Sequence, residues 1–199
     1  MEWKLIRIFL QTPDRGFYTK EITRQTGIGA GTVNNFLRNI QKDNILTKEI
    51  IGNVHLYKLN NELELVKHLK IVHTLLEFEQ QRFTEYFLDE DNMVSSIVLY
   101  GSYANGENDS KSDIDLLLLV NKKKSYTTVL QTLEKKFHRQ ISLQQMTISE
   151  WQTLKKKDKI FYESLLEKHI ILYGFPFFQT FLQNYHQSGN TNTHQICRY

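Results

Sequence analysis

Between residues 2 and 42, apolar side chains recur every three or four positions, the spacing that places them on one face of a helix. Helices are expected over residues 2–10, 19–27 and 31–42. Two runs rich in β-branched residues follow, residues 45–51 and 54–59, with Gly52-Asn53 between them. A Gly-Asn pair between two such runs predicts a hairpin. The expected order is therefore three helices and then a hairpin.

A longer helical pattern covers residues 62–88. Its apolar positions are Leu65, Leu69, Val72, Leu76, Phe83 and Phe87. Spacings of three, four or multiples of these predict one amphipathic helix. Such a helix either packs on its own domain or supports a homodimer.

From Ser95 onward the period changes to that of strands alternating with helices. Strands are expected over residues 96–100, 113–120, 141–148 and 170–174, and helices over residues 125–137, from 149, over 158–168 and over 175–185. The polar stretch from Gln187 shows no pattern and is expected to be disordered. This part of the chain therefore predicts a small sheet flanked by helices.

The N-terminal stretch FYTKEITRQTGIGAGTVNNFLRNIQKDNILTKE resembles the winged helix-turn-helix family. The resemblance implies that the third helix enters the major groove of DNA and that the hairpin touches the DNA backbone. The residues expected at the DNA are Thr32, Asn35, Arg38, Lys42, Lys48 and Lys58. Among them, Asn35 and Arg38 are the candidates for base edges, and the three lysines are the candidates for phosphates.

The distribution of charge agrees with a polyanion as the partner of the N-terminal part. The chain has a net charge of +3, whereas residues 1–60 alone hold nine basic and five acidic side chains. A basic N-terminal part on a nearly neutral remainder suits DNA, and a merely solvated basic surface is the alternative. Winged helices also bind proteins, so the fold alone leaves the partner open.

One stretch, LYGSYANGENDSKSDIDLLLLV (residues 99–120), has the residues for chemistry on phosphates. Side chains alternate along a strand, so Asp113 and Asp115 should point to the same face. Two neighbouring carboxylates repel each other, and Mg²⁺, which prefers oxygen ligands, relieves that repulsion. Backbone N–H groups at Gly101 and Ser102, with the Ser102 hydroxyl, can hold phosphate oxygens. The alternative is a polar turn that places two aspartates at the end of a strand.

The same stretch resembles the nucleotidyltransferase superfamily that includes DNA polymerase beta, and most closely its minimal nucleotidyltransferases. The family pattern is a strand, Gly-Ser, a further glycine and an Asp-x-Asp opening the next strand; here these are Gly101, Ser102, Gly106, Asp113 and Asp115. The resemblance implies that Asp113 and Asp115 are catalytic metal ligands and that a nucleoside monophosphate is transferred from a Mg²⁺-bound NTP. The acceptor would be a small molecule, an RNA end or a protein hydroxyl. Minimal nucleotidyltransferases also occur as antitoxins that modify a toxin protein.

One part of the family pattern is missing. Active members usually have another carboxylate on the third strand, but QISLQQMTIS (residues 140–149) contains neither Asp nor Glu. The expected position falls near Ser142 or Gln144. A carboxylate from the preceding loop, Glu107 or Asp109, could take its place. Two functions follow: a nucleotidyltransferase, or a DNA-binding transcriptional regulator whose nucleotidyltransferase fold is inactive or only senses a nucleotide.

The sequence thus predicts an α+β protein of two domains. The expected boundaries are 1–60 for the winged helix-turn-helix, 61–92 for a linker helix, 93–186 for a nucleotidyltransferase-fold mixed sheet flanked by helices, and 187–199 for a disordered tail. No apolar run reaches the roughly 18–20 residues that span a bilayer. The start of the chain lacks the pattern of a signal peptide, and Cys197 is the single cysteine. A cytoplasmic protein is therefore expected.

Overall fold

The computed structural model describes residues 2–174; the helix expected over 175–185 and the tail from 187 lie outside them. The N-terminal elements are α1 (Glu2–Gln11), β1 (Phe17–Tyr18), α2 (Thr19–Thr26), α3 (Ala30–Lys42), β2 (Leu46–Ile51) and β3 (Val54–Leu59). The three expected helices and the hairpin are confirmed. The structure adds β1, which pairs with β3 to give an antiparallel sheet in the order β1-β3-β2.

The single helix expected over residues 62–88 is wrong. Two helices are present, α4 (Glu64–Gln80) and α5 (Phe83–Glu90). Between them, Arg82 has left-handed backbone angles (φ 55°), which a continuous α-helix does not allow. The break lets Phe78 of α4 stack on Phe83 of α5, with 4.0 Å between ring centroids.

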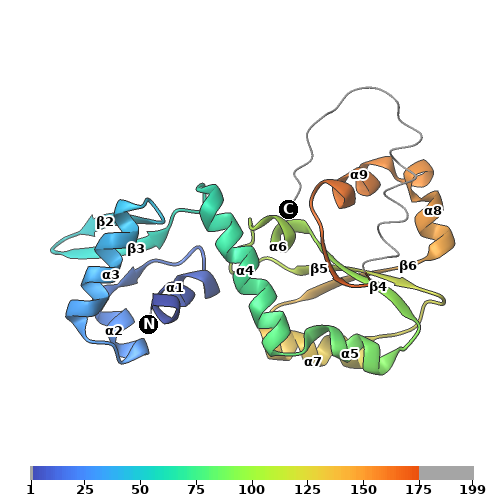
Figure 1. Cartoon of the computed structure of the whole chain (residues 1–199), viewed down its shortest axis with the longest axis horizontal. Helices are drawn as coiled ribbons and strands as arrows, with labels where there is room; N and C mark the ends of the chain where they lie inside the picture. The colour runs from blue at the N-terminus through green and yellow to red at the C-terminus, as the bar shows by residue number, and fades with distance from the viewer. Residues whose placement is uncertain (1, 175–199) are drawn as a thin grey trace.

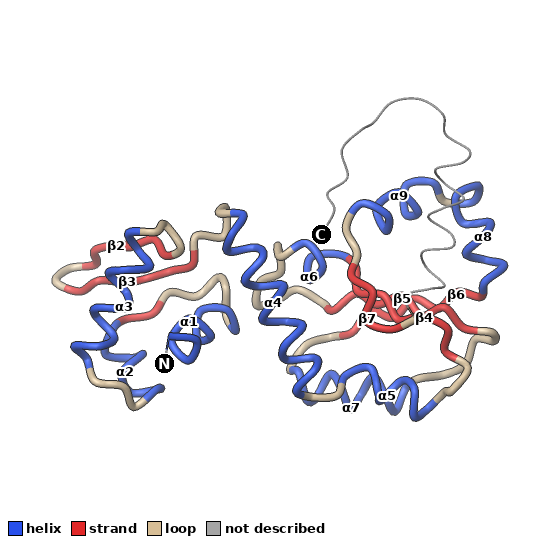
Figure 2. Tube along the Cα trace, viewed as in Figure 1, coloured by secondary structure: helices blue, strands red, loops and turns tan. Residues whose placement is uncertain are grey.

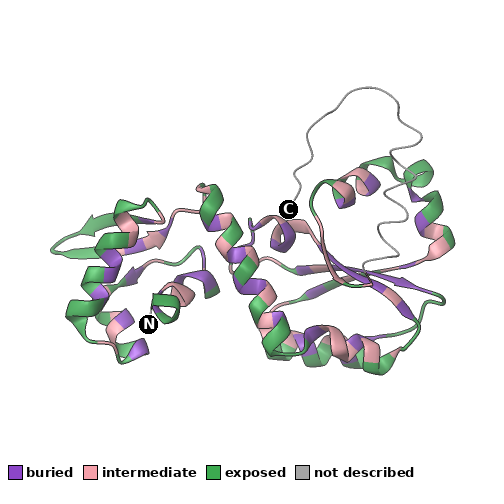
Figure 3. Cartoon of the chain, in the orientation of Figure 1, coloured by how far each residue is buried: buried purple, intermediate pink, exposed green. Residues whose placement is uncertain are grey.

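The buried face of α4 also differs from the expectation. Leu65, Val72 and Leu76 are exposed, by 51%, 47% and 41%. The inward face instead contains Val66, Lys70, His73, Thr74 and Phe78. Figure 3 shows α4 changing between exposed and buried residues along its length, where it lies between the two groups of elements. The contacts of this face are partly polar, because Lys70 donates to Asn61 and Glu77 accepts from Arg7 of α1. A hydrophobic period does not identify a helix face of this kind.

The remaining elements form a four-stranded mixed sheet with helices. They are β4 (Val94–Tyr100), α6 (Gly101–Asn105), β5 (Ile114–Val120), α7 (Thr127–Phe137), β6 (Ile141–Thr147), α8 (Ile148–Lys157), α9 (Lys159–Glu167) and β7 (Ile170–Tyr173). The strand order is β6-β5-β4-β7, in which only the β5–β6 pair is parallel. All four strands were expected, whereas α6 stands where the sequence predicted no helix.

Helices cover both faces of this sheet, with α5 and α7 on one side and α8 and α9 on the other (Figures 1 and 2). Alternate residues of β5 serve the two faces: Leu116 and Leu118 pack in the cluster with α5 and α7, while Leu117 and Leu119 pack with α8 and α9. The N-terminal elements bury a separate apolar cluster that includes Phe9, Ile22 and Leu37. In the described part of the chain, no helix is both long and apolar enough to cross a membrane.

Candidate functional site

The two aspartates lie where the sequence placed them, at the start of β5. Asp113 precedes the strand and is exposed, and Asp115 is its second residue and half-buried. Ile114, between them, is buried in the cluster with α5 and α7. Asp113 and Asp115 therefore face the opposite side of the sheet, the side of α8 and α9.

Gly101 and Ser102 meet this pair of aspartates. Tyr100, the last residue of β4, is the register partner of Asp115, so the turn into α6 begins beside that carboxylate. Gly101 has φ +68°, and a Cβ at this position would lie 2.3 Å from Asp115 Oδ2. Glycine suits these backbone angles, and a side chain at this position would displace the Asp115 carboxylate. The backbone of the Gly-Ser turn and the Asp115 carboxylate therefore lie side by side.

Ser142 occupies the position on β6 where a third carboxylate was expected. In the parallel β5–β6 pair, Asp115 is opposite Ser142, and Gln144 is opposite Leu117, farther along the strand. The structure thereby selects Ser142 from the two expected positions. Ser142 is exposed and offers a hydroxyl where a carboxylate would complete a set of three.

The electrostatics of the site reflect two neighbouring carboxylates, one of them partly buried. Burial raises the pKa of Asp115, and the negative charge of Asp113 adds to the rise, while hydrogen bonding with Ser142 opposes it. Burial likewise raises the pKa of Tyr100, and the charge of Asp115 adds to that rise. Tyr100 was not among the site residues expected from the sequence. Its position directly before Gly101, at the end of the strand, was the signal that could have identified it, because this residue pairs with Asp115.

Asp109 and Glu107, the loop carboxylates considered as replacements for the missing third carboxylate, form hydrogen bonds with residues close to them in sequence. Asp109 accepts hydrogen bonds from the Lys111 N–H (2.8 Å) and the Ser112 hydroxyl (2.9 Å), which hold its pKa below the usual range. Glu107 accepts a hydrogen bond from Asn105 Nδ2 at 2.8 Å. Across residues 2–174, no group of three or more His, Cys, Asp or Glu side chains is placed to hold a metal ion. The carboxylate set is therefore the pair Asp113 and Asp115.

The loop between α6 and Asp113 is fixed at both ends. Gly106 ends α6 with φ +73°, and a Cβ there would lie 2.3 Å from the backbone oxygen of Lys67 in α4. Ser110 donates from its N–H to Asp14 (3.1 Å) and from its hydroxyl to the same carboxylate (2.5 Å). The loop that leads to the aspartates is thereby held by α4 on one side and by the turn after α1 on the other.

The residues expected at DNA fall on two elements. Thr32, Asn35, Arg38 and Lys42 are exposed on α3, spaced three or four residues apart along one face. Thr32 and Asn35 also border a shallow hollow with Glu2 and Trp3 of α1. Lys48 is exposed on β2.

Lys58 differs from the other five. It lies on β3, is half-buried, and its Nζ is 3.0 Å from Glu49 Oε1. The Glu49 carboxylate partly neutralises its charge, so Lys58 is the weakest of the phosphate candidates.

Comparisons with known proteins agree with this geometry for the C-terminal part. Residues 81–173 match the family model described as "Polymerase beta, Nucleotidyltransferase". No curated protein matches the chain.

Two solved structures show a partial likeness. One, "Crystal structure of the toxin-antitoxin with AMP-PNP", has a TM-score of 0.37 and 18% identity, and the match covers 54% of this chain and 92% of that chain. The other, "Crystal structure the toxin-antitoxin MntA-HpeT mutant-Y104A", has a TM-score of 0.36 and 17% identity, with 55% and 92% covered. At these scores the likeness carries no argument about substrate or partner. The family match and the geometry of the Gly-Ser turn and the aspartate pair agree that residues 81–173 form a nucleotidyltransferase-like domain.

Proposed function

We propose that this domain binds a Mg²⁺–NTP complex at Gly101, Ser102, Asp113 and Asp115, and that it transfers the nucleoside monophosphate to an acceptor hydroxyl. The observation that supports this most is the close approach of the Asp115 carboxylate to the Gly101 backbone. It brings a metal-binding carboxylate and a phosphate-binding turn to one point, as transfer from a triphosphate requires.

The chain's own groups divide the work as follows. The N–H groups of Gly101 and Ser102 and the Ser102 hydroxyl hold phosphate oxygens and orient the α-phosphate. The acceptor oxygen forms a bond to the α-phosphorus, the bond from that phosphorus to the bridging oxygen breaks, and pyrophosphate leaves. The hydroxyl proton passes to water, because Ser142 stands where a carboxylate base would be.

The pair Asp113 and Asp115 fits a divalent cation. The charge of Asp113 contributes to the raised pKa of Asp115, and a divalent cation held by the two carboxylates would relieve their repulsion. Mg²⁺ is usually held in proteins by one or two carboxylates together with phosphates of the substrate, so two aspartates suffice for binding. When bound, the ion neutralises charge on the phosphates as pyrophosphate leaves.

The position of Ser142 favours a second candidate function. Without a third carboxylate, the domain would bind the nucleotide and report it to the N-terminal part without transferring it. In that case the chain is a DNA-binding regulator of transcription that senses a nucleotide.

We further propose that residues 1–60 are a winged helix-turn-helix that binds DNA and that α4 links it to the nucleotidyltransferase-like domain. The linker expected over residues 61–92 then ends with α4, because Phe83 and Phe87 of α5 pack in the core of the second domain. The support is the order of α1 to β3, together with the exposed polar face of α3. In this proposal Asn35 and Arg38 contact bases. Thr32 lies on the same face, and Lys42, Lys48 and Lys58 contact phosphates.

One experiment separates the two candidates. The protein is incubated with Mg²⁺ and each NTP labelled on the α-phosphate, alone and with lysate of the source cells. We expect wild type to transfer label and the Asp113→Ala/Asp115→Ala variant to transfer none. Glu107→Gln, which removes a carboxylate of the same loop outside the pair, is the matched control and should transfer label as wild type does. Absence of transfer by wild type, with NTP binding retained, would establish the nucleotide-sensing regulator instead.

A further inference from the structure

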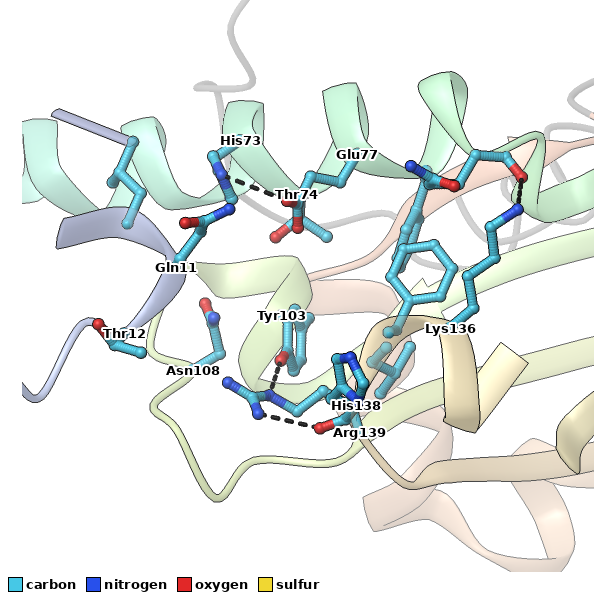
Figure 4. A pocket seen from close by; sticks show the side chains of 15 residues that line it. Gln11, Thr12, His73, Thr74, Glu77, Tyr103, Asn108, Lys136, His138 and Arg139 are labelled. Atoms are coloured by element: carbon cyan, nitrogen blue, oxygen red, sulfur yellow. Dashed lines mark hydrogen bonds and ion pairs between the residues drawn. The ribbon is translucent and has the colours of Figure 1, made fainter. Parts of the chain in front are cut away.

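A second pocket, of about 400 Å³, lies away from the aspartate pair, where the N-terminal elements meet the sheet domain. Its walls come from five segments: the end of α1, the inward face of α4, α6 with the loop after it, the start of β5, and the end of α7 with the turn that leads to β6. Figure 4 shows His73, Thr74 and Glu77 on α4 along one side, and Tyr103, Asn108 and Arg139 facing them. The volume is within the roughly 300–1,000 Å³ typical of small-molecule sites.

Two buried polar side chains of this pocket have hydrogen-bonding atoms without partners. Asn108 is 6% exposed and His73 is 4% exposed. Within the described part of the chain, neither Asn108 Oδ1 nor His73 Nε2 has a hydrogen-bond partner. The Glu77 carboxylate lies 3.7 Å from His73 Nε2, beyond hydrogen-bonding distance. A buried polar atom without a hydrogen bond destabilises the folded protein, so both atoms favour a ligand that supplies their hydrogen bonds.

The charged groups of the pocket favour an anion. Arg139 donates from Nε to the Tyr103 hydroxyl (3.1 Å) and from Nη1 to the His138 carbonyl (3.1 Å), which fixes the guanidinium in place without neutralising it. Lys136 also belongs to the lining, but its Nζ donates to the Gln81 carbonyl (3.4 Å) and the Tyr86 hydroxyl (3.2 Å), so Arg139 is the cation that faces the ligand. The one carboxylate of the lining, Glu77, is paired with Arg7 at 3.2 Å.

The pocket also has an apolar part. Leu10, Phe78, Ile114 and Phe137 contribute to its lining, and the Phe78 and Phe137 rings meet edge to face, with centroids 5.4 Å apart. A flat ring is the shape that packs best against such a surface.

We propose that this pocket is a second ligand site and that it binds a nucleoside monophosphate. The base lies against the phenylalanines and exchanges hydrogen bonds with Asn108 Oδ1 and His73 Nε2, because the edge of a nucleobase presents donors and acceptors side by side. The phosphate lies at Arg139.

This site is distinct from the aspartate pair. Ile114 lines the pocket and points to the face of the sheet covered by α5 and α7, whereas Asp113 and Asp115 point to the other face. A ligand in the pocket would touch α1 and the loop that leads to Asp113 at the same time. It would therefore fix the position of the N-terminal part relative to the nucleotidyltransferase-like domain.

The test uses the full chain with Asp113→Asn/Asp115→Asn, so that binding at the aspartate pair is disabled. AMP is titrated into this protein by calorimetry, and adenosine and inorganic phosphate are titrated separately. We expect one AMP per chain, and weaker binding of either half alone. Adding Arg139→Gln should weaken AMP binding roughly tenfold or more, as expected for the loss of a hydrogen bond to a charged group.

Two further variants guard against misfolding and general charge effects. Gln11→Glu places a negative charge on the pocket wall at an exposed position of α1, and should weaken AMP binding while the fold is kept. Lys135→Gln removes a positive charge from α7 outside the pocket lining and should leave AMP binding unchanged. The proposal is overturned if the double aspartate variant binds no AMP, or if neither Arg139→Gln nor Gln11→Glu weakens the binding. Both results are independent of whether the aspartate pair binds Mg²⁺–NTP.

Discussion

Replacing Gly106 by alanine should destabilise the protein more than the same change at any freely exposed glycine. Gly106 ends α6 in the left-handed region, and its added Cβ would lie 2.3 Å from the backbone oxygen of Lys67. That oxygen belongs to α4, so it cannot rotate away as a flexible side chain would. Either α4 or the loop that leads to Asp113 has to move.

The magnitude has two parts. An L-residue in the left-handed conformation costs about 1–2 kcal/mol. Forcing an extra carbon into a packed contact costs a further 1–3 kcal/mol or so. Together these predict a loss of about 2–5 kcal/mol in the free energy of unfolding. For a chain of this size the melting temperature should fall by roughly 2–4 °C for each kcal/mol.

Gly27 provides the matched control. It also ends a helix, α2, at φ +71°, but a Cβ there would meet no atom within 4 Å. Gly27→Ala should therefore cost only the conformational part, about 1–2 kcal/mol. Urea unfolding of both variants, followed by circular dichroism and tryptophan fluorescence, measures the difference. Equal losses for the two variants would refute the close approach of α6 to α4.

Three other predictions concern the aspartate site and α3. Ser142→Asp should raise the rate of label transfer tenfold or more, because it adds a carboxylate beside Asp115. Gln144→Asp, farther along β6, is the control. Equal effects of the two variants would contradict the register of β5 and β6. Asp115→Asn should abolish Mg²⁺–NTP binding yet stabilise the free protein at pH 7, because burial penalises the ionised carboxylate. Because folding raises the pKa of Asp115, the stability gained by Asp115→Asn should vanish below about pH 3.8, the ordinary pKa of an aspartate. The gain should grow as the pH rises to the raised pKa and stay constant above it. Melting curves across pH measure this gain, and a gain independent of pH would contradict burial of the charged carboxylate as its cause. Arg38→Ala should weaken DNA binding by about 1–3 kcal/mol in a mobility-shift assay and leave NTP affinity unchanged. Arg82→Ala, at another exposed arginine, is the control and should change neither affinity. Equal loss of both affinities in Arg38→Ala would argue against two separate functions.

The aspartate site could be predicted from the sequence because its residues lie close together along the chain. Two aspartates separated by one residue must share a face of a strand, and the Gly-Ser pair lies on the turn that leaves the neighbouring strand. The third position needed more than local information. Sequence spacing left Ser142 and Gln144 open, and the parallel register of β5 and β6 decided for Ser142.

The buried face of the linking helix α4 could not be predicted from the sequence, for a physical reason. A hydrophobic period identifies the inward face only when the surface it packs against is apolar. On α4 that surface is partly polar, so Lys70 and His73 are buried while Leu65 and Val72 are exposed. The homodimer, given as an alternative role for this helix, stays untested.

The second pocket was likewise invisible in the sequence. Its polar groups, Gln11, His73, Asn108 and Arg139, come from four separate segments, and only the folded chain brings them together.

The central claim is that Gly101, Ser102, Asp113 and Asp115 form one Mg²⁺–NTP site. Its most direct test is calorimetric titration of the wild-type protein with a non-hydrolysable NTP analogue, with Mg²⁺ and with the metal chelated, beside Asp113→Ala/Asp115→Ala. We predict one analogue bound per chain with Mg²⁺, and at least tenfold weaker binding both without the metal and in the variant. Equal affinity in all three titrations would contradict the claim.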